Sequence, residues 1–167
     1  MSVTQHRAEA PTSLRVAVLT ISDTRTLETD TSGSLILEMI NAAGHSLSDR
    51  AIVPDEPDPM RHHLLAWRDR GDIDAALLTG GTGISTRDQT YETISAILSK
   101  PLPGYGELFR MLSYAEIGPA AILSRALGGL MDQLVVLVMP GSRAAVKLAM
   151  EKIILPELPH LVREARK

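Results

Sequence analysis

The residues best suited to chemistry form a glycine-rich stretch in the middle of the chain, from Thr79 to Gly83 (TGGTG). An apolar segment, 75–79, leads into it and is typical of a buried strand, while Asp88 lies five residues beyond Gly83 at the start of an expected helix. Glycines after a strand let the backbone approach a ligand and present N–H groups to it. An acid beside a phosphate site implies a cation between the two. The pattern therefore favours nucleotide or phosphate chemistry with a divalent metal ion.

The spacing of these glycines differs from two familiar phosphate-binding motifs. No Lys-Ser or Lys-Thr pair follows them, which excludes a Walker A loop, and Gly80, Gly81 and Gly83 do not fit G-x-G-x-x-G. A tight turn without a ligand would use the same glycines. The other polar residues must decide between these two interpretations.

Polar clusters follow four expected strands, and parallel strands would bring all four to one edge of a sheet, where α/β proteins bind ligands. The expected strands cover 14–21, 49–53, 75–79 and 134–139. The clusters that follow them are Ser22-Asp23, Pro54-Asp55, Thr79 to Gly83, and Pro140-Gly141-Ser142. This convergence favours a ligand site.

Asp55 and Asp88 are the candidate metal ligands, because Mg²⁺ is usually bound by one or two carboxylates together with substrate phosphates. Structural roles remain open for both residues. Asp88 could be an acid favoured by the dipole of the helix that follows, and Asp55 could be a turn residue after Pro54.

Several other polar residues have a structural and a ligand-binding interpretation. Thr90 and Ser142 are expected N-caps, although the segment at Ser142 could also bind an anion. Asp23 could cap a helix or bind a ligand. Arg125, placed with Ser124 in an expected strand, could pair with a surface acid or hold a phosphate.

A second group of residues offers weaker signals. Glu107, Arg110 and Ser113 share one face of an expected helix, where an ion pair is the simpler interpretation. The histidines form no ligand pattern, and His45, His62, His63 and His160 are expected at the surface.

The elements that must position these residues alternate between strand and helix, which predicts an α/β domain with a mostly parallel sheet covered on both faces. Asp58 and Pro59 are expected to start one helix, and a turn at Asp132-Gln133 to join two antiparallel strands. Expected helices cover 33–43, 58–70, 90–99, 106–113 and 142–154, with a helical tail after Pro156; 101–104 is an expected loop and 122–130 an expected strand.

The composition limits the class of protein. The 167 residues suit one domain, expected over 13–167 after a disordered polar leader at 1–12. A net charge of −3 argues against a nucleic-acid surface, and the absence of cysteine excludes disulfides, thiol nucleophiles and thiolate metal sites. No apolar run reaches membrane-spanning length, so we expect a cytoplasmic protein without a membrane partner.

The motifs together resemble the molybdopterin-binding family, the MoaB/MogA group of molybdenum cofactor biosynthesis proteins, and are most similar to its protein B branch. The resemblance covers roughly 14–160. It is carried by Thr79 to Gly83 with Arg87 to Thr90, Asp30 to Gly33, Gly106 to Ser113, Ile117-Gly118, Leu123 to Ala126, and Met139 to Ser142.

The resemblance implies a three-layer α/β/α sandwich whose mostly parallel sheet carries one antiparallel strand. It implies assembly into trimers or hexamers and work alongside other molybdenum cofactor biosynthesis proteins. It also implies binding of molybdopterin, a pterin with a dithiolene and a terminal phosphate. In active members that phosphate attacks the α-phosphorus of Mg-ATP, which gives adenylylated molybdopterin and pyrophosphate.

The resemblance also assigns roles. Asp55 and Asp88 would be catalytic and would hold Mg²⁺. The implied cofactor-binding residues are Thr79, Gly80, Gly81, Thr82, Gly83, Thr90, Glu107, Ser113, Ser124 and Arg125, with Asp23, Pro140, Gly141 and Ser142 as nucleotide contacts. The alternatives are a non-catalytic molybdopterin carrier, a general nucleotide-binding module and a purely structural oligomer.

Overall fold

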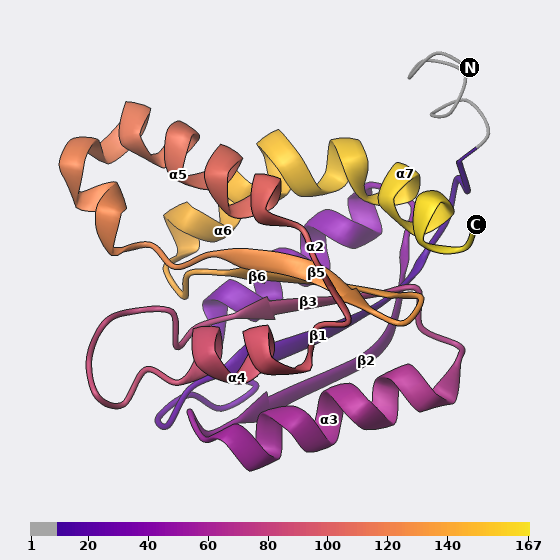
Figure 1. Ribbon diagram of the computed structural model, residues 1–167, viewed down its shortest axis with the longest axis horizontal. Helices are drawn as coiled ribbons and strands as arrows, with labels where there is room; N and C mark the ends of the chain where they lie inside the picture. Colours follow the sequence, from indigo (N-terminus) through magenta and orange to yellow (C-terminus); the bar gives the residue numbers. More distant parts are fainter. Residues whose placement is uncertain (1–9) are drawn as a thin grey trace.

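In the computed structural model, which describes residues 10–167, one six-stranded sheet has the order β2-β1-β3-β6-β5-β4 (Figure 1). Four strands, β1, β2, β3 and β6, are parallel, whereas β5 runs antiparallel to both of its neighbours. The strands are β1 (Arg15–Ile21), β2 (Ser46–Val53), β3 (Ala75–Thr79), β4 (Lys100–Pro101), β5 (Leu127–Met131) and β6 (Leu134–Met139). The predicted sheet with one antiparallel strand is confirmed. Most of the expected leader, residues 1–9, lies outside the described residues.

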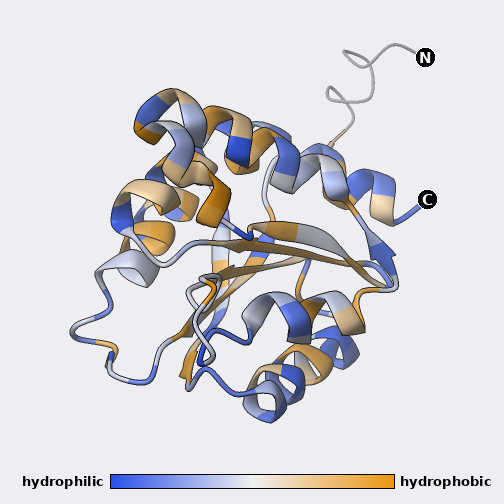
Figure 2. Cartoon of the chain, turned by 60° about the vertical axis from the view of Figure 1, so that its left-hand side comes forward, coloured by the Kyte–Doolittle hydropathy of each residue, from blue (hydrophilic) through white to orange (hydrophobic). Residues whose placement is uncertain are grey.

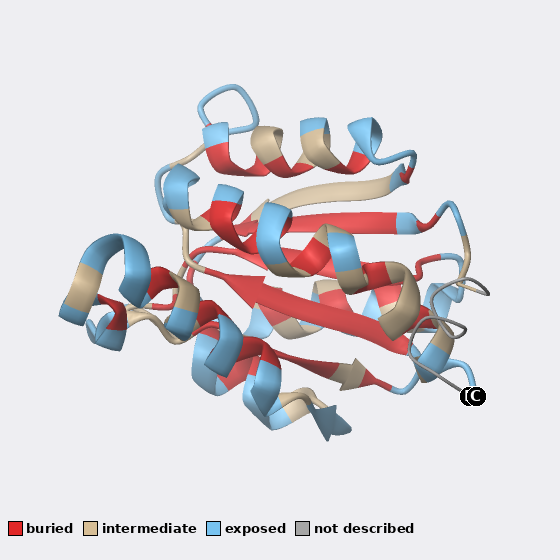
Figure 3. Cartoon of the chain, turned by 90° about the horizontal axis from the view of Figure 1, so that it is seen from above, coloured by how far each residue is buried: buried red, intermediate tan, exposed pale blue. Residues whose placement is uncertain are grey.

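The central strands are buried on both faces, which explains their nearly continuous apolar sequences. Alternate residues of β1 point to opposite layers: Val16 and Val18 join one core cluster, and Ala17 and Leu19 join the other. Figure 2 shows the hydrophobic strands at the centre of the molecule, and Figure 3 shows them buried beneath helices whose outer faces are exposed.

Helices cover both faces of the sheet and complete the predicted three-layer sandwich (Figure 1). One face is covered by α2 (Thr31–Ala42), α5 (Pro103–Ile117), α6 (Arg143–Ala149) and α7 (Leu155–Ala165), and the other by α3 (Pro57–Arg70) and α4 (Thr90–Ile97). A π-helical turn (η2, Met150–Ile154) joins α6 to α7, and α7 is the helical tail that the sequence predicts. No helix within residues 10–167 is long and apolar enough to cross a membrane.

The expected strand at 122–130 is wrong over its first half. A 3₁₀ helix (η1, Gly118–Leu123) precedes a loop, and β5 begins only at Leu127. Ile122 and Leu123 gave the segment its apolar character, but they are exposed rather than packed in the sheet. Ser124 and Arg125 therefore lie in a loop and not in a strand.

Three helices begin at residues other than the predicted ones, because a different residue caps or opens each of them. Asp30 caps α2, which begins at Thr31, two residues before the expected start at Gly33. Pro57, rather than Pro59, opens α3, so Asp58 lies inside the helix and does not cap it. Likewise, α5 opens at Pro103 and runs to Ile117, well beyond the predicted helix at 106–113.

Two expectations about single residues also fail. His45, expected at the surface, is buried against the start of β2, and burial lowers the pKa of its imidazole. Lys100 and Pro101, in which Pro101 was expected to open a loop, form the short strand β4 and pair with Leu130 and Gly129 of β5.

Candidate functional site

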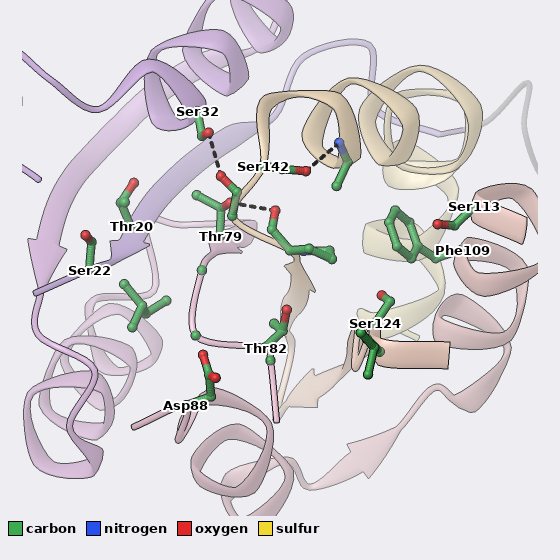
Figure 4. A pocket seen from close by; sticks show the side chains of 18 of the residues that line it. Thr20, Ser22, Ser32, Thr79, Thr82, Asp88, Phe109, Ser113, Ser124 and Ser142 are labelled. Atoms are coloured by element: carbon green, nitrogen blue, oxygen red, sulfur yellow. Dashed lines mark hydrogen bonds between the residues drawn. The ribbon is translucent and has the colours of Figure 1, made fainter. Parts of the chain in front are cut away.

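A cavity of about 570 Å³ lies where β1, β3 and β6 end (Figure 4). The register places Thr20 of β1 beside Thr79 of β3, and Thr79 beside Met139 of β6, so the segments that follow these strands meet. The strand order reverses between β1 and β3, which is the usual position of a ligand in an open α/β sheet.

The glycine loop after β3 forms part of the lining, and two of its glycines have backbones that other residues rarely adopt. Gly80 has a φ of 108°, and a Cβ there would lie 2.2 Å from the carbonyl oxygen of Ile21. Gly81 has a φ of 63°, and its Cβ would lie 2.1 Å from Oγ1 of Thr90. The loop thus packs against β1 and α4 at distances that only glycine allows.

One wall of the cavity comes from β1 and the start of α2, where Thr20, Ser22 and Ser32 lie on the same side (Figure 4). The Ser32 hydroxyl donates to the carbonyl oxygen of Gly141 at 2.8 Å, which ties α2 to the loop after β6. In that loop Ser142 caps α6, as predicted, by accepting from the Ala145 amide.

The buried carboxylate of Asp30 holds this wall in place. It accepts hydrogen bonds from Oγ1 of Thr20, the amide of Gly33 and a guanidinium nitrogen of Arg50. Burial alone would raise the pKa of Asp30, but these hydrogen bonds outweigh it and lower the pKa. Asp30 is therefore an ionised structural acid.

The opposite wall comes from α5 and the loop after η1, with Phe109, Ser113 and Ser124 facing the cavity (Figure 4). Ile117 and Leu123 extend it as an apolar surface. The Ser124 hydroxyl is buried and has no hydrogen-bond partner among the described residues. A buried hydroxyl without a partner is costly, so a ligand with a polar group at this position would be favoured.

The two candidate metal ligands both lie against the glycine loop, Asp55 beside Gly81 and Asp88 beside Gly83. Asp88 lines the cavity and accepts from the amide and hydroxyl of Ser85. Asp55 lies behind the loop, where its Oδ1 accepts from the amide of Gln89 at 2.9 Å and its Oδ2 would meet a Cβ on Gly81. Within residues 10–167, no three His, Cys, Asp or Glu side chains form a metal-binding group.

The pKa of Asp55 is raised, first because the carboxyl is buried and also because the negative charges of Asp88 and Asp23 are near. The hydrogen bond from Gln89 and the charge of Arg87 only partly offset this. The ionised form of Asp55 is thus less favoured here than in an exposed aspartate, and a bound cation would stabilise it. The donor set of two carboxylates fits Mg²⁺.

Asp23 has the opposite environment. Its carboxylate accepts two hydrogen bonds from Arg87, at 2.6 and 2.8 Å, and one from the amide of Asp55. Arg87 lowers the pKa of Asp23 to about 2. Asp23 is therefore held by an arginine and does not line the cavity.

Arg125 fastens the glycine loop from outside the cavity. Its guanidinium donates to the carbonyl oxygens of Thr82 and Gly83, pairs with Glu92, and lies 5.3 Å from the centre of the Tyr91 ring. These contacts use most of the hydrogen-bond donors of Arg125, so in this structure the side chain acts as a clamp that holds the glycine loop.

The structure brings most of the predicted site residues to the cavity and leaves five of them away from it. Those that line it are Thr79, Gly80, Gly81, Thr82, Gly83, Asp88, Ser113, Ser124, Pro140, Gly141 and Ser142. Asp23, Asp55, Thr90, Glu107 and Arg125 lie outside the lining. Thr90 is the first residue of α4 and not its N-cap, and its hydroxyl contacts the sulfur of Met60.

Sequence reasoning missed part of the lining. Glu107 and Ser113 share a helix but face different cavities, whereas the cavity-facing Phe109 between them was not proposed. Ser32 and Arg25 also line the cavity, and the sequence motifs assign neither of them a role there. The position of Ser32, two residues after a capping Asp and before a glycine, could have indicated a polar group at the cavity edge.

Comparison with known proteins agrees with this geometry. Residues 17–160 match the family described as "Probable molybdopterin binding domain". The chain is 55% identical to the molybdenum cofactor biosynthesis protein B of Halalkalibacterium halodurans and 53% identical to that of Bacillus subtilis, in each case covering 100% of this chain and 99% of the relative.

Solved structures give the same result. A crystal structure of molybdenum cofactor biosynthesis protein B matches with a TM-score of 0.91 and 50% identity, covering 95% of this chain and 99% of that chain. The tungsten cofactor synthesizing protein MoaB from Pyrococcus furiosus matches with a TM-score of 0.84 and 36% identity, covering 95% and 100%.

Proposed function

Because the chain belongs to the molybdopterin-binding family of molybdenum cofactor biosynthesis proteins, we propose that it adenylylates molybdopterin with Mg-ATP. The motifs that suggested the family are confirmed by the comparisons, and the role in molybdenum cofactor biosynthesis follows from them. The proposal of adenylyl transfer rests on the geometry of the site.

The observation that carries the proposal is the position of Asp55 and Asp88 around one glycine loop. In a purely structural turn, a buried carboxylate whose pKa is raised by burial and by neighbouring acids would be a cost that its hydrogen bond from Gln89 only partly offsets. The same arrangement is useful where a cation and phosphates are bound together. The two acids would hold Mg²⁺, which when bound offsets charge on the transferring and leaving phosphates.

The cavity walls suit molybdopterin. The apolar surface of Phe109, Ile117 and Leu123 would cover the pterin, and the unpartnered hydroxyl of Ser124 could donate to it. The glycine loop would bring backbone close to the terminal phosphate. An oxygen of that phosphate would then attack the α-phosphorus of ATP, and the bond to the leaving pyrophosphate would break.

The test is a turnover assay with purified protein, freshly released molybdopterin, ATP and Mg²⁺, which measures adenylylated product and pyrophosphate. We expect stoichiometric product from the wild type and a loss of at least about a hundredfold in Asp88→Asn, since one of the two carboxylates that would hold Mg²⁺ is removed. The matched control is Asp58→Asn on α3, where the acid is exposed and paired with Arg61.

Tight binding of molybdopterin without adenylylated product would contradict the proposal. The protein would then be a carrier. Equal turnover in Asp88→Asn and Asp58→Asn would refute the role of Asp88 while leaving the activity in place.

We also propose a homo-oligomer. Large hydrophobic side chains are exposed along one face of α5 and in η1, an arrangement that indicates a contact surface. This apolar patch consists of Leu108, Met111, Tyr114 and Ile122, none of which lines the main cavity. A second copy of the chain is the occupant that fits the family.

A further inference from the structure

Arg125 contacts several peptide groups of the segment between β3 and α4, and these contacts have a common direction. Its Nε donates to the carbonyl oxygen of Thr82 at 3.2 Å, and one Nη donates to the carbonyl oxygens of Gly83 and Asp88, the latter at 3.5 Å. Thr82, Gly83 and Asp88 line the main cavity, whereas Arg125 does not. Three carbonyl groups of this segment therefore face a guanidinium that lies outside the cavity lining.

The direction of each carbonyl fixes the direction of the amide that follows it, because C=O and N–H are antiparallel in a planar trans peptide. All peptide bonds within residues 10–167 are trans. The peptide between Asp88 and Gln89 illustrates the consequence. Its carbonyl faces Arg125, and its N–H donates on the opposite side to Oδ1 of Asp55 at 2.9 Å.

The same geometry leaves two consecutive amides of the glycine loop available. Since the carbonyls of Thr82 and Gly83 face Arg125, the N–H groups of Gly83 and Ile84 point away from it. Neither N–H donates a hydrogen bond within the part of the chain that the structure describes. Successive N–H groups of this kind can form a concave site for an anion.

The guanidinium of Arg125 is itself held from the side of α4. It pairs with Glu92, lies 5.3 Å from the centre of the Tyr91 ring, and belongs to a side chain that is only 24% exposed. An arginine held in this way presents its planar fork of donors in one orientation, which the single ammonium of a lysine cannot reproduce.

We propose that Arg125 is a positioning residue for the proposed reaction. By holding the carbonyls of the glycine loop outward, it presents the amides of Gly83 and Ile84 to the terminal phosphate of molybdopterin. This rests on the proposed function. Arg125 acts through the loop and contacts neither substrate. Because the amides would bind this phosphate before and during the reaction alike, their loss should raise the KM for molybdopterin more than it lowers kcat.

The first test follows the backbone amides by NMR of ¹⁵N-labelled protein during titration with inorganic phosphate in the presence of Mg²⁺. We expect phosphate to shift the amide protons of Gly83 and Ile84 downfield in the wild type. In Arg125→Gln the affinity for phosphate should fall about tenfold or more, because two oriented donors to an anion are lost.

Arg125→Lys separates geometry from charge, because it keeps the positive charge and replaces the fork by one ammonium. We expect it to lose at least about threefold in phosphate affinity. The matched control is Arg110→Gln. Arg110 is a partly buried arginine on α5 that also donates to a backbone carbonyl, that of Ala126, but does not line the main cavity. Its loss should leave the affinity within about twofold of the wild type.

Wild-type affinity in Arg125→Lys would show that charge alone suffices and would overturn the proposal. Unchanged affinity in Arg125→Gln, an equal loss in Arg110→Gln, or a wild type whose Gly83 and Ile84 amides do not respond to phosphate would overturn it as well. Circular dichroism checks that the variants are folded. If Arg125→Gln unfolds, the comparison of Arg125→Lys with the wild type decides.

The turnover assay distinguishes failure of this proposal from failure of the proposed function. We expect Arg125→Gln to raise the KM for molybdopterin about tenfold and to leave the KM for ATP within about threefold. Product from the wild type, with an unchanged KM for molybdopterin in Arg125→Gln, would refute the positioning role alone. Loop amides that bind phosphate only when Arg125 is present, in a wild type that forms no adenylylated product, would refute adenylyl transfer alone.

Discussion

At the scale of single residues, Asp55 is placed where ionisation is harder than for an exposed aspartate. Because the pKa is raised in the folded protein, the free energy of unfolding falls as the pH rises from the ordinary value of 3.8 through the folded pKa, and the loss is complete above it. A residue that destabilises the fold but is present nonetheless is expected at a functional site, where activity has a cost in stability.

We therefore predict that Asp55→Asn raises the melting temperature at neutral pH and abolishes turnover. Asn keeps an oxygen to accept from Gln89 but carries no charge. The gain should shrink as the pH falls toward the titration range of the carboxyl, above its ordinary value of 3.8, because the wild-type residue is then neutral as well. Thermal unfolding of both proteins over a pH series measures this, and a less stable variant at neutral pH would refute the reasoning.

At the scale of elements, the glycine loop connects β3 to α4 through a backbone that a side chain would disrupt. We predict that Gly81→Ala lowers the free energy of unfolding by about 1–3 kcal/mol, because alanine is strained at the positive φ of this position. The added Cβ should also displace the side chains of Thr90 and Asp55, which lie where it would be placed. Nucleotide binding should fall with it. Urea unfolding and titration with ATP check both effects.

Gly104→Ala is the matched control for that prediction. Gly104 lies in the first turn of α5, and a Cβ there meets nothing within 4 Å. We expect its stability to be unchanged or slightly higher, because alanine loses less conformational entropy on folding. Equal losses in the two variants would mean that glycine content alone, and not the geometry of the loop, sets stability.

The sequence allowed the elements to be predicted wherever an apolar run ended at a polar cluster. This held for β1, β3 and β6, and so the edge that carries the cavity was predicted correctly. It failed at 122–130, because Ile122 and Leu123 are exposed on a 3₁₀ helix and their hydrophobicity does not reflect a buried strand.

Contacts between distant segments could not be read from spacing. Arg87 reaches Asp23 across 64 positions, and Arg125 reaches Thr82 across 43. The partner of Arg87 is one of 20 acids in the chain, and Thr82 accepts through a backbone carbonyl that every residue has, so residue type distinguishes neither partner. Only the folded sheet selects among these pairs, which is why the pairing of Arg87 with Asp23 and the clamp on the glycine loop were not predicted.

At the scale of the whole molecule, the apolar patch on α5 and η1 predicts assembly. Ile122, which is 82% exposed, contributes little to the core of one chain, so Ile122→Asp should leave the fold intact and place a charge in the subunit interface. We expect the wild type to be a trimer or hexamer and the variant to shift toward monomer, as measured by light scattering after size exclusion.

Leu65→Asp controls for the added charge, because Leu65 is a partly exposed leucine on α3, on the other face of the sheet. It should leave the mass unchanged. A monomeric wild type, or dissociation by Leu65→Asp as well, would show that the apolar patch is not the interface.

The lining of the main cavity is drawn from positions between 20 and 145, on segments that meet only when the sheet is complete. No fragment or half-folded chain can therefore hold the ligand, and its affinity adds in full to the stability of the native protein. A ligand at a hundred times its dissociation constant would contribute about 2.7 kcal/mol. The survival of each copy in the cell would then depend on the supply of its ligand, so that the amount of protein would follow the amount of ligand without any dedicated sensor.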